Sequence, residues 1–333
     1  MGLEFTTQTD EAQFYSPMAD FEEDAVEIEL REDPLTGQQT RIVEQVFPQT
    51  EERPELPPSV TDADGCFFCP EMVHDATPEY PDFVDADRGE VGESVSFPNL
   101  FPYAEHANVV VLTEEHFVQI EEFSADVLAD GLANALEYVN AVADAHSPSF
   151  ASINMNLLPS SGSSVVHPHM QAIVDDHGTN DARRRVAAER EFYDEHGRTY
   201  WETLLEAERD GPRYVGTTGD VEWLAPFAPR HHWHVAGVTD VTGIPEPDDE
   251  LVTDLAAGLE NVLGHYGSLG LNAHNFAIHL HEGEASPVTV DVVARAPLSD
   301  HYVTDAFFMH TLHDERLVDV APEEYAPEVA EQF

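Results

Sequence analysis

The sequence predicts an α+β protein made of two related half-barrels of antiparallel sheet with flanking helices. Two amphipathic helix patterns, each followed by two apolar strands, are the first observation behind this prediction. The second is a repeat: the order strand, helix, strand, strand occurs at roughly residues 108–174 and again at roughly 231–296. An internal duplication is the simplest account, and we expect an N-terminal half over 1–180 and a C-terminal half over 181–333.

In the first half, residues 1–60 are acidic and Pro-rich, and we expect them to be irregular except for a hairpin over 26–47 that turns at "DPLTG". "NVVVLTEEH" then predicts a strand, and the apolar spacing of residues 124–146 predicts a helix with Ser124 as its N-cap. "FASINMNLLP" is a further predicted strand. The small residues of "SSGSS" form a turn into "VVHPHMQAIV", which we also expect to be a strand.

In the second half, residues 181–210 predict a long helix or a helix pair, and "RYVGTTGDVEWLAPFAP" predicts a hairpin. The strand "HHWHVAGV", a helix over 248–267 and the strands "HNFAIHLH" and "VTVDVVARAP" then repeat the order of the first half. The helix ends and the paired strands set a register between the two copies. In this register the corresponding residues of the two copies are His167 and Thr289, His169 and Asp291, and Gln171 and Val293.

The charge of the chain is extreme, with 66 Asp and Glu residues against 14 basic residues, all of them Arg, and a net charge of −52. The acids run through every segment, so an acidic tail does not explain them. A uniformly acidic surface around an apolar core suggests a protein that works in molar salt, where the Debye length falls to about 3 Å and self-repulsion is screened. We hypothesise a cytoplasmic protein of the haloarchaeal type.

The same composition argues against several classes of partner. Duplex nucleic acid is a poor partner, because the surface has no basic footprint. No apolar run approaches 18 residues, and the N-terminus "MGLEFTTQTD" has no basic segment followed by an apolar one. We therefore expect neither a membrane span nor a secretory signal.

The two cysteines, Cys66 and Cys69, stand together in "CFFCP". A C-x-x-C pair indicates either a redox pair or half of a zinc site. A redox pair of the thioredoxin kind sits at a helix start after a strand, whereas "TDADGCFFCPEM" reads as a polar loop, so we favour zinc. His231, His232 and His234 form a second possible metal cluster, although half-buried sheet residues are the favoured interpretation of these three.

The segment "SSVVHPHMQAIV" places His167, His169 and Gln171 at two-residue spacing, so on a strand all three point the same way. Pro168 lacks an N–H group, which favours an edge or an active-site rim. One histidine on a strand is usually structural, but two histidines and a glutamine on one face after a Gly/Ser turn favour chemistry. A neutral imidazole attacks phosphorus when an acceptor holds its other nitrogen, and Gln171 and the backbone N–H groups of "SGSS" can bind phosphoryl oxygens.

These residues resemble the galactose-1-phosphate uridylyltransferases, a branch of the histidine-triad superfamily with two fused copies of the fold. The resemblance rests on the H-P-H-x-Q motif in "NLLPSSGSSVVHPHMQ" together with the C-x-x-C-P loop "CFFCPEM". Weaker pieces occur in the same order: "DPLTG", "FPNLFPY", "LTEEH", "VEWLAPFAP" and "VTVDVVARAP". The resemblance spans roughly residues 27–327, and it implies two histidine-triad-like half-barrels.

The resemblance also implies roles for individual residues. His169 would be the nucleophile that forms a covalent uridylyl-histidine, with its Nδ1 held by a backbone carbonyl, and Gln171 would steady the phosphoryl oxygens. A structural zinc would be bound by four residues: Cys66, Cys69, His116 and His167. Contacts to nucleotide or phosphate would come from a further set: Arg53, Asn99, Asn156, Gly162 and Ser164.

The reaction implied by the resemblance is ping-pong transfer of a uridylyl group between a nucleotide sugar and a sugar 1-phosphate, in a homodimer. The nearest rival is a phosphorylase or hydrolase of the same superfamily acting on an ADP-sugar or a dinucleoside polyphosphate. A rival from another class is a non-catalytic nucleotide-binding zinc protein. The phosphorylase or hydrolase would have the same nucleophile with phosphate or water as acceptor, whereas the non-catalytic protein would form no adduct with any nucleotide.

The salt hypothesis makes a prediction that needs only the purified chain. With 66 acids and 14 basic residues, unscreened repulsion opposes the compact state, so the protein should lose structure in low salt. Circular dichroism melts at increasing KCl should show a melting temperature that rises with salt. A melting temperature independent of KCl would overturn the hypothesis.

Overall fold

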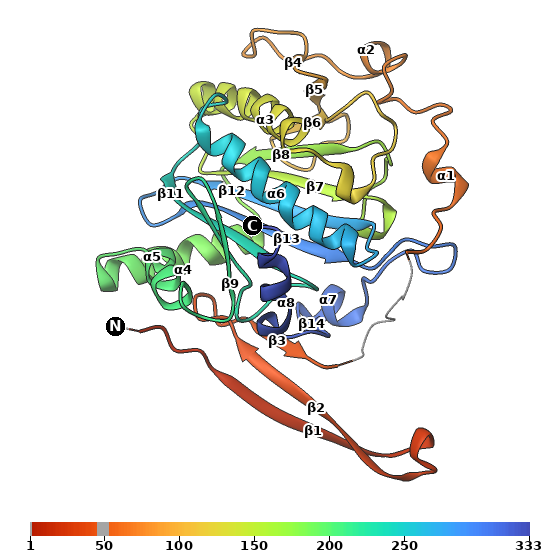
Figure 1. Cartoon of the computed structure of the whole chain (residues 1–333). Coiled ribbons are helices and arrows are strands. Elements are labelled where there is room, and N and C mark those ends of the chain that lie inside the picture. The colour runs from red at the N-terminus through yellow and green to blue at the C-terminus, as the bar shows by residue number, and fades with distance from the viewer. Residues whose placement is uncertain (1, 45–52) are drawn as a thin grey trace.

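The structure is a computed structural model that describes residues 2–44 and 53–333 (Figure 1). Its centre is a ten-stranded sheet with the strand order β4-β5-β6-β8-β7-β12-β13-β11-β10-β9. The first half of this sheet, with its helix, consists of β4 (Gly89–Val91), β5 (Ser94–Pro98), β6 (His106–Val111), α3 (Ala125–His146), β7 (Phe150–Leu157) and β8 (His169–Asp175). The second consists of β9 (Tyr214–Thr218), β10 (Val221–Leu224), β11 (Val235–Thr242), α6 (Glu250–Ser268), β12 (Ala273–His281) and β13 (Pro287–Arg295).

From its outer edge inward, the first half has the order β4-β5-β6-β8-β7 and the second half has the order β9-β10-β11-β13-β12. The two halves thus follow the same order, as expected for a duplicated unit. The two halves meet where β7 pairs antiparallel with β12, so a single sheet runs through both. This confirms the predicted α+β class with antiparallel strands and flanking helices. The boundary predicted between residues 180 and 181 stays a prediction, because both halves share one sheet.

The register between the two copies follows from their helix starts. Ser124 caps α3 by accepting a hydrogen bond from the N–H of Val127, and Asp249 caps α6 through the N–H of Leu251. Counted from these caps, Val110 corresponds to Val235. Val110 pairs with Met170, and Val235 pairs with Val292. Asp291 therefore occupies in the second copy the position that His169 occupies in the first.

The core lies between one face of the sheet and the helices α3 and α6, which pack side by side across it (Figure 1). Alternate residues of each central strand face these helices, for example Ile153 and Met155 of β7 and Ile278 of β12, all nearly fully buried. The residues between them, such as Asn154 and Asn156, face the opposite side. The apolar alternation of the sequence thus fixes which face of the sheet is free to carry polar groups.

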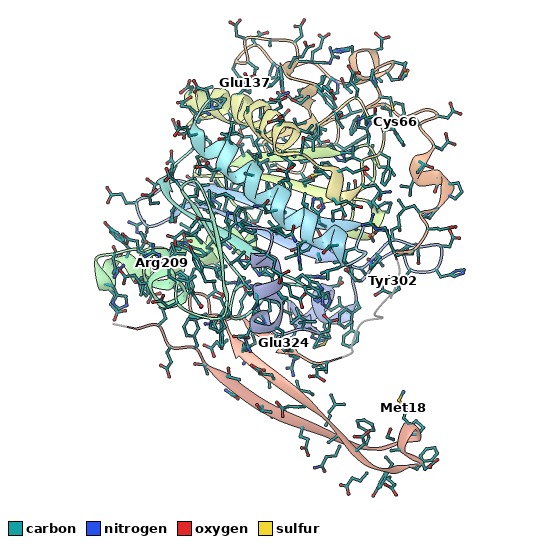
Figure 2. The ribbon with its side chains drawn as sticks, viewed as in Figure 1. Met18, Cys66, Glu137, Arg209, Tyr302 and Glu324 are labelled. Carbon is teal, nitrogen blue, oxygen red and sulfur yellow. The ribbon has the colours of Figure 1, made fainter. Side chains whose placement is uncertain are left out.

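A second, small sheet includes a projecting hairpin. The strands β1 (Thr7–Ser16), β2 (Glu22–Glu32), β3 (Gln39–Ile42) and β14 (Arg316–Val318) are joined in that order, and β14 runs parallel to β3. The β1–β2 hairpin extends away from the body, with Met18 at its tip (Figures 1 and 2). We expected an irregular segment here, and β1 corrects that expectation. Nine of its ten residues are exposed, so no apolar alternation marks it as a strand.

The remaining elements lie between the strands of the two sheets or at the C-terminal end of the chain. The sequence left a long helix or a helix pair open for residues 181–210, and the structure forms the pair α4 and α5. These connecting elements are η1 (Pro17–Ala19), α1 (Pro58–Thr61), α2 (Val73–Ala76), η2 (Ile120–Glu122), η3 (Pro159–Ser161), α4 (Asn180–His196), α5 (Tyr200–Glu208), α7 (Phe308–His313) and α8 (Pro322–Ala330). None of the described helices combines the length and apolar character needed to cross a membrane.

The strand that carries the H-P-H-x-Q motif begins later than predicted. We expected one strand over residues 165–174, but β8 starts at His169, where pairing with Val111 begins. Pro168 has no N–H to donate, and only its carbonyl continues the ladder by accepting from the N–H of Leu112 at 3.1 Å. His167 therefore lies in the connection just before the strand.

The buried His274 offers a test of the core. Its ring is fully buried between Phe123 and Phe276, and neither ring nitrogen has a hydrogen-bond partner among the described residues. Burial lowers its pKa to about 3, so the ring is neutral in the folded state. Replacement by leucine removes two unsatisfied polar atoms at similar volume, and we expect His274→Leu to raise the free energy of unfolding by about 1–2 kcal/mol. Urea unfolding at constant high KCl measures this change.

A matched control lies on the opposite face of the same strand. His279 donates through Nε2 to the carboxylate of Asp291 at 3.0 Å, so His279→Leu should lower the unfolding free energy. If His274→Leu destabilises the protein as His279→Leu does, the ring nitrogens of His274 have partners in solution and the account of this core position is wrong.

Candidate metal centre and active site

Four side chains from three loops converge beside the first half of the sheet. Cys66 and Cys69 come from the loop between α1 and α2, His116 follows β6, and His167 precedes β8 (Figure 2 labels Cys66). Their ligand atoms all lie within 4.8 Å of one another. Cys66 Sγ lies 3.7 Å from Nδ1 of His167, and Cys69 Sγ lies 3.6 Å from Nδ1 of both His116 and His167.

This geometry fits a tetrahedral zinc ion. Zn–S bonds of about 2.3 Å and Zn–N bonds of about 2.0 Å at tetrahedral angles place sulfur and nitrogen ligands roughly 3.5 Å apart. The sulfur-to-nitrogen distances of 3.6–3.7 Å agree with that spacing. Burial, and to a smaller extent Cys66, raises the pKa of the Cys69 thiol to about 11, so a thiolate at this position requires a cation beside it.

The ring nitrogen of His167 that points away from the cysteines, Nε2, also has a hydrogen-bond partner. Its Nε2 lies 2.8 Å from the carbonyl oxygen of Thr113, so the proton sits on Nε2 and the lone pair of Nδ1 faces the two cysteines. Burial lowers the pKa of His167 to about 4, which keeps the imidazole neutral, the form that binds metal ions. Residues Cys66, Cys69, His116 and His167 thus can hold a metal ion.

His169 is oriented by the same segment. Its Nδ1 lies 2.9 Å from the carbonyl oxygen of His167 and donates its proton there, which leaves the lone pair on Nε2. The ring is buried, and burial lowers its pKa, opposed in part by the hydrogen bond to His167. Phe68 of the cysteine loop packs edge-on against the ring at 5.3 Å between centroids. A neutral imidazole with one free, directed lone pair is the form in which histidine acts as a nucleophile.

Gln171 follows on the same face of β8. Its side-chain nitrogen lies 3.4 Å from Nε2 of His169, and its side-chain oxygen accepts a hydrogen bond from the hydroxyl of Tyr103. Asn154 of the neighbouring strand donates to the backbone carbonyl of Gln171 at 3.2 Å. The amide N–H₂ group of Gln171 therefore points toward Nε2 of His169.

The small-residue turn after β7 is a closed structure. The N–H groups of Ser161, Gly162 and Ser163 donate to the carbonyls of Leu158 or Pro159, and Gly162 has φ +95°. The hydroxyls of Ser161 and Ser163 donate to backbone carbonyls as well. These bonds correct the expectation that the "SGSS" N–H groups as a set are available to a phosphate. Ser164, at the exposed end of the turn, leads back toward His167.

Second-half residues brace this turn. Asn275 of β12 donates to the carbonyl of Ser161 at 3.0 Å and to the side-chain oxygen of Asn156 at 2.5 Å. Arg295 of β13 donates to Asn275, and its Nε lies 2.9 Å from the carboxylate of Asp305. The second copy has no histidines at the positions of His167 and His169, but its residues support the turn next to these two histidines.

The other predicted contact residues have varied surroundings. Asn156 lies on the polar face of β7, and Asn99 closes a turn by accepting from the N–H of Phe101 at 3.0 Å. Arg53 forms a two-pronged ion pair with Glu121, with distances of 2.7 and 2.9 Å, and donates to the carbonyl of Gly267. These partners belong to η2 and α6 rather than to the strand of His169. The predicted contacts of Arg53, Asn99, Asn156, Gly162 and Ser164 with substrate stay predictions.

A cavity of about 560 Å³ opens on the polar face of the sheet. Ile173, two residues beyond Gln171 on the same face of β8, lines it, as do Asn154 and Asn156. Its far end lies against the second half, where Asp291 contacts Arg185 at 2.7 Å and His234 and His279 at 3.0 Å. Although burial raises the pKa of Asp291, Arg185 and Arg230 lower it well below its usual range. A carboxylate with these partners therefore replaces, in the second copy, the nucleophile candidate of the first.

Sequence reasoning missed the residues that act across large sequence separations: Phe68, Tyr103, Asn275 and Arg295. For Asn275 a signal existed, because the duplication places it opposite the polar face of β7. Tyr103 is the last residue of the "FPNLFPY" segment, but no periodicity in that segment points to Gln171.

No family model matches the sequence. A protein of Archaeoglobus fulgidus described as uncharacterized is 36% identical to it over 307 residues, covering 91% of this chain and 92% of the relative. The chain belongs to the family of this archaeal protein. The description of that relative names no reaction, so this membership by itself carries no function.

Several solved structures share the fold of the present chain over nearly its whole length. An ADP-glucose phosphorylase of Arabidopsis thaliana with bound ADP-glucose has a TM-score of 0.69, a GalT-like protein of the same plant 0.67, and a uridylyltransferase 0.66. Each is 19% identical, and the similarity covers 91% of this chain and 97–99% of the other chain. The predicted fold class is thereby confirmed, because the chain shares the fold of these structures over 91% of its length.

The metal centre makes a stoichiometric prediction. If the four residues bind zinc, the purified protein should contain one zinc per chain, and Cys66→Ser or His116→Ala should lower that content because each removes one of four ligands. Inductively coupled plasma mass spectrometry after dialysis against a weak chelator measures it. His74→Ala is the control, since His74 is exposed in the neighbouring helix α2. A content of one zinc that survives Cys66→Ser would sink the ligand assignment.

Proposed function

We propose that the protein is a nucleotidyl transferase that moves a uridylyl group between a UDP-hexose and a hexose 1-phosphate through a covalent intermediate on His169. One observation carries this proposal. The Nδ1 of His169 is held by the carbonyl of His167, and the lone pair of Nε2 faces the amide of Gln171. Two residues beyond Gln171 on the same strand, Ile173 lines a cavity of about 560 Å³. A buried, neutral and oriented imidazole beside a hydrogen-bond donor suits attack on phosphorus.

In the proposed first step the Nε2 lone pair of His169 attacks the α-phosphorus of the nucleotide sugar. A P–N bond forms, the bond from phosphorus to the bridging oxygen breaks, and hexose 1-phosphate leaves with the electron pair. In the second step a phosphate oxygen of the incoming hexose 1-phosphate attacks the same phosphorus, the P–N bond breaks, and Nε2 regains its lone pair. The Nδ1 proton stays on the hydrogen bond to His167 throughout.

The other predicted residues have supporting roles in this proposal. Gln171 donates to a phosphoryl oxygen during the transfer. Zinc, bound by Cys66, Cys69, His116 and His167, supplies structural stability to the loop that carries Phe68 against His169. Contacts to nucleotide or phosphate come from the set predicted from the sequence: Arg53, Asn99, Asn156, Gly162 and Ser164.

The setting of the reaction is part of the same proposal. We place the protein in the cytoplasm of a salt-adapted cell of the haloarchaeal type, because its net charge is −52 and its basic residues are all Arg. We also propose a homodimer. Exposed apolar side chains at Val303, Phe308 and Leu312, with exposed fractions of 58%, 58% and 77%, support a covered surface near α7.

An ADP-sugar phosphorylase is the second candidate. It would use the same nucleophile, with an adenylyl intermediate and inorganic phosphate as acceptor. The observation that favours it is the fold shared with an ADP-glucose phosphorylase, whose TM-score of 0.69 is similar to the 0.66 of the uridylyltransferase. The base and the acceptor therefore have to be determined by experiment.

Mass spectrometry of the intact protein tests the proposal. After incubation with UDP-glucose in high KCl, the protein should gain the mass of one uridylyl group, and His169→Ala should gain none because the attacking nitrogen is missing. His177→Ala is the control, since His177 is exposed just beyond β8 and should keep the adduct.

The outcomes separate the candidates. A uridylyl adduct that hexose 1-phosphate removes supports the transferase. An adenylyl adduct from ADP-glucose that inorganic phosphate removes supports the phosphorylase instead. An unmodified protein with both nucleotide sugars leaves a non-catalytic nucleotide-binding protein and contradicts the proposed covalent chemistry.

A further inference from the structure

We propose that Tyr103 is a positioning residue that sets the orientation of the Gln171 amide toward His169. Its hydroxyl donates to the side-chain oxygen of Gln171, and the side-chain nitrogen of Gln171 lies 3.4 Å from Nε2 of His169. This inference rests on the proposed function, because it concerns the residue that would bind the phosphoryl oxygens there.

The hydrogen bonds around Gln171 run in one direction. Tyr103 donates to the amide oxygen, the amide N–H₂ points to the Nε2 lone pair of His169, and Nδ1–H of His169 donates to the carbonyl of His167. A rotated amide would place its oxygen against the Nε2 lone pair and would leave the tyrosine hydroxyl without its acceptor. The direction of the chain therefore selects one of the two amide orientations.

The selected orientation is the one that transfer requires. When Nε2 forms a bond to phosphorus, its lone pair is no longer an acceptor, and the negatively charged phosphoryl oxygens lie next to the amide of Gln171. The N–H₂ group can donate to these oxygens without rotating, whereas the amide oxygen in its place would repel them. Tyr103 thus acts on the reaction only through Gln171.

The position of Tyr103 makes its hydroxyl a clean target. The residue lies in the connection between β5 and β6, and its exposed fraction is 68%. Asn99 ties down the start of this connection: its N–H donates to the carbonyl of Ala107 at 2.8 Å, and its side chain accepts from the N–H of Phe101. Loss of the hydroxyl alone leaves these bonds in place, so Tyr103→Phe should fold normally.

A double-mutant cycle on the full chain tests the inference. In high KCl, Tyr103→Phe should form the nucleotidyl adduct on His169 about tenfold more slowly in a single turnover, with little change in the nucleotide-sugar concentration at half-maximal rate. In a Gln171→Ala background the same substitution should cause no further loss, because the hydroxyl acts through Gln171. Tyr15→Phe is the matched control: Tyr15 has an exposed fraction of 71% and lies in the N-terminal hairpin.

A second measurement decides the contact without any turnover. With ¹⁵N-labelled glutamine side chains, the amide signal of Gln171 is assigned by its disappearance in Gln171→Ala. Tyr103→Phe should shift this signal, and Tyr15→Phe should leave it unchanged.

The two measurements keep the failures apart. A protein that forms no adduct with UDP-glucose or ADP-glucose overturns the proposed function, and the amide signal still decides whether Tyr103 orients Gln171. Where the adduct forms, equal rates in Tyr103→Phe and the parent protein, or losses that add fully in the double variant, overturn the positioning role. An unshifted amide signal in Tyr103→Phe overturns it as well.

Discussion

The hydrogen bond from the His169 ring to the carbonyl of His167 is the interaction on which the candidate site depends. It joins two sites through one residue, since the side chain of His167 faces the cysteines while its carbonyl orients the neighbouring histidine. Pro168, between them, interrupts the strand ladder and allows the backbone to serve both. Any shift of the metal centre would therefore move the acceptor that selects the tautomer of His169.

The second copy supports the turn beside the candidate site. Asn275 holds the turn that leads into the histidine segment, and Arg295 holds Asn275. At the position equivalent to His169, Asp291 is buried among Arg185, His234 and His279. The same strand position of the duplicated fold thus holds a histidine in one copy and a buried, ion-paired carboxylate in the other.

Local patterns predicted the elements well and the long-range contacts poorly. Helices α3 and α6 follow from their N-caps and apolar spacing, and the four metal-binding candidates, named through a family resemblance, do converge in space. The hairpin strand β1 was not predicted, because both of its faces are exposed and its sequence has no alternation of apolar and polar residues. The sequence predicted that the N–H groups of the "SGSS" turn are available to phosphate. In the structure these N–H groups close the turn itself. This closure depends on backbone angles that composition does not reveal.

By itself the sequence determined the strand and helix order, the duplication, and the two-residue spacing that places His169 and Gln171 on one face of β8. Those properties depend on periodicity and neighbouring residues, which a single chain displays directly. Only the tertiary structure decided that Tyr103 meets Gln171, that Arg53 pairs with Glu121, and that the second half braces the first. Such contacts join residues far apart in the chain, so they exist only once the packing of the two halves has brought the residues together.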